Sequence, residues 1–182
     1  MSTLELSIGR RIRALRGAMT LEMLARQAGV SRAMLSRVER GESSPTAQFL
    51  ARLALGLGVR LSTLLTEDAA SPLSRASSQP LWQDPASGYL RRAISPPGTG
   101  ACVDIVEIIF PAGARVGFDN RRDLGLDQQV WVLEGALHLT LAGLRHELAA
   151  GDCLHMRLDQ PVEFHNPTDQ PTRYAVIIGG RT

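Results

Sequence analysis

The chain is 182 residues long, has a formal net charge of +2 and contains two cysteines. This length suits one ordinary domain or two small ones. Apolar residues nowhere run long enough for a membrane-spanning helix, and the first residues lack the charged-then-apolar pattern of a secretory signal, so we expect a cytoplasmic protein with no membrane partner. Cys102 and Cys153 lie in apolar, strand-like surroundings without paired spacing, which predicts buried, reduced thiols rather than a disulfide.

The charge is unevenly distributed along the chain. Residues 1–65 hold ten arginines and four acidic residues, a balance of +6, whereas residues 66–182 hold ten arginines and fourteen acidic residues, a balance of −4. This asymmetry is typical of a basic nucleic-acid-binding module joined to a more acidic one.

Local patterns divide the chain into three zones and predict an α-then-β fold. Residues 1–67 are rich in Leu, Ala and Arg at helical spacing, residues 68–88 are rich in Pro and Ser and read as a linker, and residues 89–182 predict a sandwich or barrel of short strands. The predicted strands are Cys102–Phe110, Gln129–Leu133, Ala136–Leu141, Gly151–Met156 and Arg173–Ile178.

The helical zone divides into five short helices. Ile8, Ile12 and Leu15 predict the buried stripe of the first. Ser or Thr caps and terminal glycines then predict a second helix from Thr20 to Gly29, a third from Ser31 to Gly41, a fourth from Pro45 to Gly58 and a fifth from Ser62 to Leu65.

The third predicted helix has one basic and one apolar side. At about 100° per residue, the basic side holds Arg32, Ala33, Ser36, Arg37 and Arg40, and the other side holds Met34, Leu35 and Val38. Positive charge combined with small side chains fits the DNA major groove, where arginine can bind guanine through two hydrogen bonds. On amphipathicity alone, a solvated basic face of a protein-interaction helix is equally consistent.

The segment from Thr20 to Thr46 closely resembles the phage-repressor-like (xenobiotic-response-element, XRE) helix-turn-helix family, and the resemblance extends over residues 6–65. It implies a five-helix, lambda-repressor-like domain that binds a double-stranded DNA operator. We expect a homodimer, because one recognition helix buries too little surface to be selective, whereas two reach half-sites about one helical turn apart. The family positions are occupied by Ala25, Gly29, Ser31, Leu35, Ser36, Glu39, Gly41, Pro45 and Thr46.

The same resemblance assigns roles to individual residues. By position, the residues that face base edges are Arg32, Ala33, Ser36 and Arg37, and those that contact phosphates are Thr20, Ser31, Arg40 and Thr46. In this family the glutamate at the position of Glu39 more often pairs with an arginine of the first helix, so we expect a structural role for it. Because the turn after that helix is shorter than is usual in the family, either Arg13 or Arg16 could be its partner.

Residues 95–180 resemble the cupin family, a double-stranded β-barrel, through the segments Val130–Leu139, Leu148–Asp152 and Pro161–Asn166. Many cupins hold a divalent metal through histidines and a glutamate of two motifs. Here the glutamate position falls on Gln128, the first-motif histidines on or near Arg121 and Asp123, and the second-motif histidine on Val162. Because arginine and valine do not ligate metals, the resemblance implies a barrel without metal, other cofactor or enzymatic activity.

The inward-facing positions are instead predicted to bind a small polar effector, with a carboxylate opposite Arg121. A few polar groups in an apolar concavity are typical of such sites. The alternatives are that Arg121 and Asp123 lie on a solvated loop (119–127), and that His155 and His165 form a new metal site. The predicted pocket residues are Arg121, Asp123, Gln128, Val130, Val132, Val162 and Phe164.

Together these features predict a sequence-specific transcriptional regulator whose operator affinity is changed by a small molecule bound in the cupin barrel. Repression is the expected outcome, and activation is the alternative. Two other function classes remain open: a metal-dependent cupin enzyme with an accessory DNA-binding module, and a protein-interaction module such as an antitoxin or a sigma-factor partner.

Overall fold

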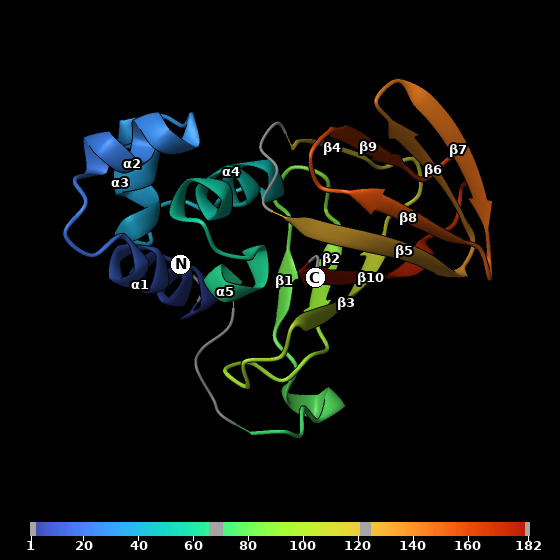
Figure 1. The fold of residues 1–182 in the computed structure, drawn as a ribbon, viewed down its shortest axis with the longest axis horizontal. Coiled ribbons are helices and arrows are strands. Elements are labelled where there is room, and N and C mark those ends of the chain that lie inside the picture. Colours follow the sequence, from blue (N-terminus) through green and yellow to red (C-terminus); the bar gives the residue numbers. More distant parts are fainter. Residues whose placement is uncertain (1–2, 66–70, 121–124, 181–182) are drawn as a thin grey trace. The chain divides into compact units, whose positions relative to one another are not determined.

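The computed structural model describes residues 3–65, 71–120 and 125–180. The chain divides into two compact units, Met1–Glu67 and Asp68–Thr182, the first helical and the second built from strands (Figure 1). The order of helical and strand-rich parts is the one predicted. Among the described residues, no helix has the length and apolarity needed to cross a membrane.

The helical unit contains the five predicted helices, α1 (Thr3–Arg16), α2 (Leu21–Ala28), α3 (Arg32–Glu39), α4 (Ala47–Leu57) and α5 (Leu61–Leu65). The hydroxyls of Thr20, Ser31 and Thr46 cap α2, α3 and α4, accepting backbone hydrogen bonds of 3.1, 3.4 and 3.2 Å. Gly29 and Gly58 end α2 and α4 in the left-handed conformation, with φ of 64° and 68°.

The core of the helical unit is built around Ile8, Ile12, Leu24 and Leu35, each at most 1% exposed. Leu15 was predicted to share the buried stripe of α1 but is only half-buried. At Gly9, α1 approaches α3 so closely that an added Cβ would lie 2.4 Å from the carbonyl oxygen of Val38. This contact sets the spacing of α1 and α3.

The β unit contains one six-stranded and one four-stranded antiparallel sheet. The strand orders are β1-β2-β3-β10-β5-β8 and β4-β9-β6-β7. Their bounds are β1 (Leu81–Gln83), β2 (Leu90–Ala93), β3 (Val103–Phe110), β4 (Arg115–Asp119), β5 (Leu126–Glu134), β6 (Ala136–Leu141), β7 (Leu144–Ala149), β8 (Cys153–Arg157), β9 (Pro161–His165) and β10 (Thr172–Gly180).

The two sheets pack face to face through apolar and aromatic side chains. The Phe164 ring on β9 stacks on the Tyr174 ring on β10, with ring centroids 6.0 Å apart and an interplanar angle of 12°. Val130 and Val132 on β5 are fully buried in the same core. The alternation of buried and exposed residues along each strand follows from the strand period of two.

Asn166, directly after β9, organises the loop that leads to β10. It is fully buried, and its amide nitrogen donates to the carbonyl oxygens of Phe110, Pro111 and Gln170 at 3.1, 3.0 and 2.7 Å. Its side-chain oxygen accepts from the Thr168 backbone N–H at 3.0 Å and from the Thr168 hydroxyl at 2.8 Å. One side chain thus satisfies the backbone of two separate segments.

Some sequence-based expectations differ from the structure. The segment read as a linker, 68–88, contains β1, whose Trp82 is only 6% exposed. The prediction that Cys102 and Cys153 are buried was wrong, because both are exposed. Cys153 pairs in register with Trp131, which is 47% exposed, so both side chains lie on the outer face of the six-stranded sheet.

Candidate nucleic-acid interface and interior of the β unit

The basic side of α3 is directed away from the core of the helical unit. Arg32, Ala33 and Arg37 are exposed and Ser36 is half-buried. On the opposite side of α3, Leu35 and Val38 are at most 1% exposed. We call the four outward residues of α3 the reading face; they are the residues assigned to base edges by the family resemblance.

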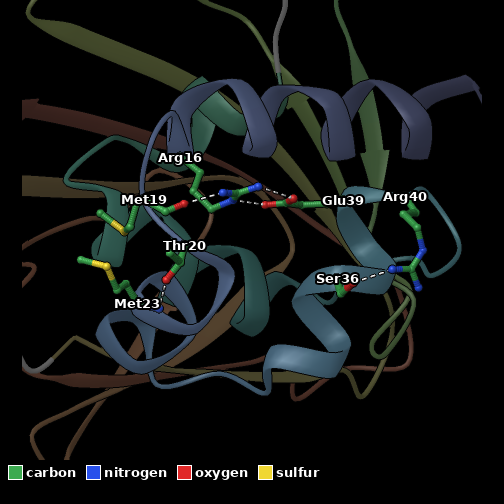
Figure 2. A network of polar contacts seen from close by, with 7 residues as sticks. All are labelled: Arg16, Met19, Thr20, Met23, Ser36, Glu39 and Arg40. Carbon is green, nitrogen blue, oxygen red and sulfur yellow. Dashed lines mark hydrogen bonds and ion pairs between the residues drawn. The ribbon is translucent and has the colours of Figure 1, made fainter.

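A bidentate ion pair anchors α3 to the end of α1. The Arg16 guanidinium donates to both carboxylate oxygens of Glu39, at 2.7 and 3.0 Å, and also to the carbonyl oxygen of Met19 (Figure 2). Of the two candidate partners for Glu39, the structure selects Arg16. The hydrogen bond to Glu39 raises the pKa of Arg16. The pair holds α1, the turn before α2 and α3 together.

The capping hydroxyls of Thr20, Ser31 and Thr46 lie at helix N-termini, where free backbone N–H groups and the helix dipole favour anions. Thr20 and Ser31 are exposed, and Thr46 is half-buried. Each hydroxyl accepts its capping bond through oxygen, which leaves its hydrogen available to a phosphate. Capping and phosphate contact are therefore compatible at these residues.

Arg40 has partners within the protein that sequence reasoning did not anticipate. Its guanidinium donates to both oxygens of Glu42, at 2.6 and 2.7 Å. It also donates to the Ser36 hydroxyl (Figure 2). This pairing raises the pKa of Arg40 and lowers the pKa of Glu42. A phosphate would have to compete with Glu42 for Arg40.

The described residues of the predicted pocket all lie in the core of the β unit. Gln128, Val130, Val132, Val162 and Phe164 are 7%, 0%, 0%, 4% and 5% exposed. The other two, Arg121 and Asp123, lie outside the described residues.

Of the positions that hold metal ligands in many cupins, the two within the described residues, Gln128 and Val162, do not fit a metal. Gln128 pairs in register with Met156 and Ile178, and Val162 pairs with Phe118 and Leu141, so apolar side chains surround both positions. Within the described ranges, no three His, Cys, Asp or Glu side chains gather as a metal would require.

The two histidines considered for a new metal site are not brought together. His155 belongs to β8 of the six-stranded sheet and lies 3.7 Å from Asp127. His165 belongs to β9 of the four-stranded sheet, where its ring is 5.6 Å from that of His138. Phe164 is directed inward and His165 outward, as strand alternation predicted.

His165 has a lowered pKa because burial disfavours its charged form and because positive neighbours surround it. In order of effect, burial is followed by Arg115 and His138, then by Glu163, which acts in the opposite direction, and finally by Arg145. These side chains share the outer face of the four-stranded sheet, where Arg115 also pairs with Glu163 at 3.0 Å.

Sequence reasoning missed a buried polar group on the inner face of the six-stranded sheet. Arg91 on β2 is 5% exposed, and Tyr89 and Tyr174 in the same core are 5% and 4% exposed. The available signal was the alternation of Tyr89, Arg91 and Ala93, but an arginine at the middle position breaks the apolar pattern that marks an inward face.

Comparisons with known proteins agree with both units. The family models that match are Helix-turn-helix, over residues 10–64, and Cupin domain, over residues 108–178. The chain is 28% identical over 160 residues to the HTH-type transcriptional regulator SutR of Escherichia coli (strain K12), covering 87% of this chain and 85% of that protein.

Solved structures extend the comparison. An HTH_3 family transcriptional regulator from Vibrio cholerae superimposes with a TM-score of 0.81 and 25% identity, over 98% of each chain. The hydroxypropylphosphonic acid epoxidase from S. wedmorenis gives a TM-score of 0.50 at 14% identity, over 98% of this chain and 100% of that one, a likeness of fold alone. The chain is an XRE-type helix-turn-helix protein that carries a C-terminal cupin domain.

Proposed function

We propose that this protein is a transcriptional regulator that binds a DNA operator through α3 and whose operator affinity changes when a small molecule binds the cupin domain. The observation that carries the proposal is the reading face, which presents Arg32 and Arg37 with small residues between them on a helix fixed by its buried side. A helix of this kind fits the major groove, and arginine is suited to guanine.

The proposed assembly is a homodimer in the cytoplasm that represses its target. One α3 offers few base contacts, whereas two copies reach half-sites about 34–36 Å apart on one side of the duplex. Thr20, Ser31, Thr46 and Arg40 are the proposed phosphate contacts, which set the position of α3 but carry no sequence information. SutR and the Vibrio cholerae protein are both named as transcriptional regulators, which supports this reading.

Duplex titrations test the proposal, with promoter DNA bound by the purified full-length protein and a scrambled duplex of equal length. Arg32→Ala and Arg37→Ala are expected to lose about 1–3 kcal/mol of binding free energy on the operator and much less on the scrambled duplex. Arg40→Ala is expected to weaken both duplexes alike and to lower the slope of log affinity against log salt by about one.

Arg13→Ala is the matched control, because Arg13 is an exposed arginine of α1 outside the reading face. It should retain the operator preference. Equal losses of Arg32→Ala and Arg37→Ala on the operator and the scrambled duplex would contradict base reading by α3. A stable complex with another protein, with no salt-sensitive duplex binding, would favour the protein-interaction alternative instead.

We propose that a small effector binds the core residues of the cupin domain, Gln128, Val130, Val132, Val162 and Phe164, and that Arg121 and Asp123, which lie outside the described residues, contribute to the site. We propose no catalysis and no cofactor, since Gln128 and Val162 stand at positions where many cupins have metal-ligating glutamate and histidine. Metal analysis of the purified protein tests this part, and stoichiometric iron, zinc or manganese would favour a metal-dependent enzyme.

A further inference from the structure

We propose that Arg91 is the anion-binding group of the effector site, and that the effector is a small carboxylate with an apolar or aromatic body. This inference rests on the proposed function, because it takes the core of the β unit as the effector site. It replaces Arg121, the arginine expected from the sequence, with one that lies on the inner face of the six-stranded sheet.

The register of the strands places Arg91 within this core. On β2, Arg91 pairs with Trp82 of β1 on one side and with Ile108 of β3 on the other. The same row continues through Tyr174 on β10 to Val132 on β5. The row therefore links Arg91 to Val132, one of the predicted pocket residues, through side chains on the same face of the sheet.

Arg91 differs from its neighbours in lacking a carboxylate partner. Arg92, the next residue, lies 3.3 Å from Glu107, and Arg173 lies 2.9 Å from the same carboxylate, both on the outer face of this sheet. Among the described side chains, none forms an ion pair or a hydrogen bond with the Arg91 guanidinium. The negative charge of Asp104 raises the pKa of Arg91.

Burial without a partner disfavours a charged guanidinium. Burial lowers the pKa of Arg91, and Tyr89 and Asp104 only partly offset this effect. Arginine nevertheless remains charged in proteins, so the core holds a positive charge that has lost most of its hydration. An anion entering the core would supply the missing partner, because the planar guanidinium matches a carboxylate through two parallel hydrogen bonds.

The surroundings of Arg91 indicate what the rest of the ligand is. The rings of Tyr89 and Tyr174 both contact Phe110 edge-on, at centroid distances of 6.0 and 6.1 Å, and Tyr174 also stacks on Phe164. Burial raises the pKa of both tyrosines, so their hydroxyls stay protonated and able to donate to a carboxylate. Apolar rings complement an apolar ligand body better than a sugar or a polyamine.

A carboxylate suits this site better than a phosphate. A phosphate dianion brings more charge into the core and more oxygen atoms that need donors. The guanidinium of Arg91 offers two parallel N–H donors, which match the two oxygens of a carboxylate. Inorganic phosphate is therefore the negative comparison in the test.

The two tryptophans offer a direct binding assay in the full-length protein. Trp82 is buried next to Arg91 in register, whereas Trp131 is 47% exposed on the outer face. In a Trp131→Phe background, fluorescence reports on Trp82 alone. We expect benzoate to change this fluorescence with saturation, and benzamide, its neutral analogue, and phosphate to bind at least about tenfold more weakly.

Substitutions assign that binding to Arg91. In the same background, Arg91→Gln is expected to lower benzoate affinity at least about tenfold, whereas Arg92→Gln, the matched control on the same strand, retains it. Equal benzoate affinity of Arg91→Gln and the parent, equal affinity for benzoate and benzamide, or the absence of saturable benzoate binding would overturn the proposal. Operator titration of Arg91→Gln distinguishes a failure of this inference from a failure of the proposed function. If the variant retains the operator preference, the proposed DNA binding stands whether or not benzoate binds.

A second measurement requires no ligand. If Arg91 is kept for an anion, replacing it by an apolar residue of similar length removes an unpaired buried charge and should not destabilise the free protein. We expect Arg91→Met to keep or raise the melting temperature of the β unit, followed by Trp82 fluorescence. A fall of more than about 4 °C would show that Arg91 supports the fold and would overturn the proposal.

Discussion

Two arginine–glutamate pairs in the helical unit have similar geometry and differ in exposure, which makes them a controlled test of what holds α3. Arg16 and Glu39 are joined by two hydrogen bonds, and their side chains are 15% and 7% exposed. Arg40 and Glu42 are also joined by two hydrogen bonds, but their side chains are 54% and 47% exposed. Glu39→Gln and Glu42→Gln remove the same charge from the two environments.

We expect Glu39→Gln to destabilise the helical unit by about 2 kcal/mol. Leaving a buried hydrogen-bonding group without its partner costs about 1–3 kcal/mol, and breaking a fully buried ion pair costs about 3–5 kcal/mol. The partial exposure of Arg16 places this pair in the lower range. For a unit of this size, about 2 kcal/mol corresponds to about 8–16 °C in melting temperature.

Circular dichroism at a helical wavelength follows the melting of the helical unit, while tryptophan fluorescence follows the β unit, which contains both tryptophans. Glu42→Gln should leave the helical transition nearly unchanged, because exposed ion pairs contribute little. The reasoning fails if both variants shift the helical transition equally. A double-mutant cycle with Arg16→Met would measure the coupling directly.

Three further substitutions test other parts of the fold. Gly9→Ala should destabilise the helical unit by about 1–3 kcal/mol in thermal melts, because its Cβ would overlap the Val38 carbonyl; unchanged melting would contradict the close approach of α1 and α3. Asn166→Ala should destabilise the β unit by about 2–4 kcal/mol in urea titrations, since several backbone groups lose their partner. The pKa of His165 is lower in the folded protein than in the unfolded chain, so the β unit should lose stability as the pH falls below about 6.5. His165→Gln should remove part of this loss of stability, and Arg115→Gln should reduce it. Identical profiles of stability against pH for the parent and both variants would refute this role of His165.

The helical unit was predictable because its boundaries are set by local chemistry. Thr20 and Gly29 begin and end α2 through their own backbone and side-chain properties, so no distant contact is needed to find them. The outward direction of Arg32 and Arg37 likewise follows from the period of a helix. The pairing of Arg40 with Glu42 was not predictable in this way, because Glu42 lies beyond the end of α3 and the turn decides where it points.

The β unit was less predictable because both faces of its larger sheet carry apolar residues. Ile105 and Trp131 are exposed on the outer face, so the alternation that normally separates inside from outside is weak in β3 and β5. In β2, by contrast, a charged residue lies on the inner face, because Arg91 occupies an inward position. At β7, every described residue is exposed or half-buried, so no apolar alternation marks the strand. β3 and the middle of β5 were nonetheless predicted from their β-branched runs, whereas β2 and β7, which lack such runs, were missed.

The way α3 is held constrains how an effector could regulate the protein. The close approach at Gly9 and the Arg16–Glu39 pair fix α3 to α1 within one unit, so a ligand in the cupin domain is not expected to reshape the reading face. In the proposed homodimer, the adjustable quantity is the placement of the two α3 copies on their half-sites. A ligand changes operator affinity only as far as it prefers one such placement. Thermodynamic linkage then requires that the operator duplex change the affinity for the effector by the same factor by which the effector changes the affinity for the operator. Benzoate titrations with and without operator duplex therefore measure this coupling.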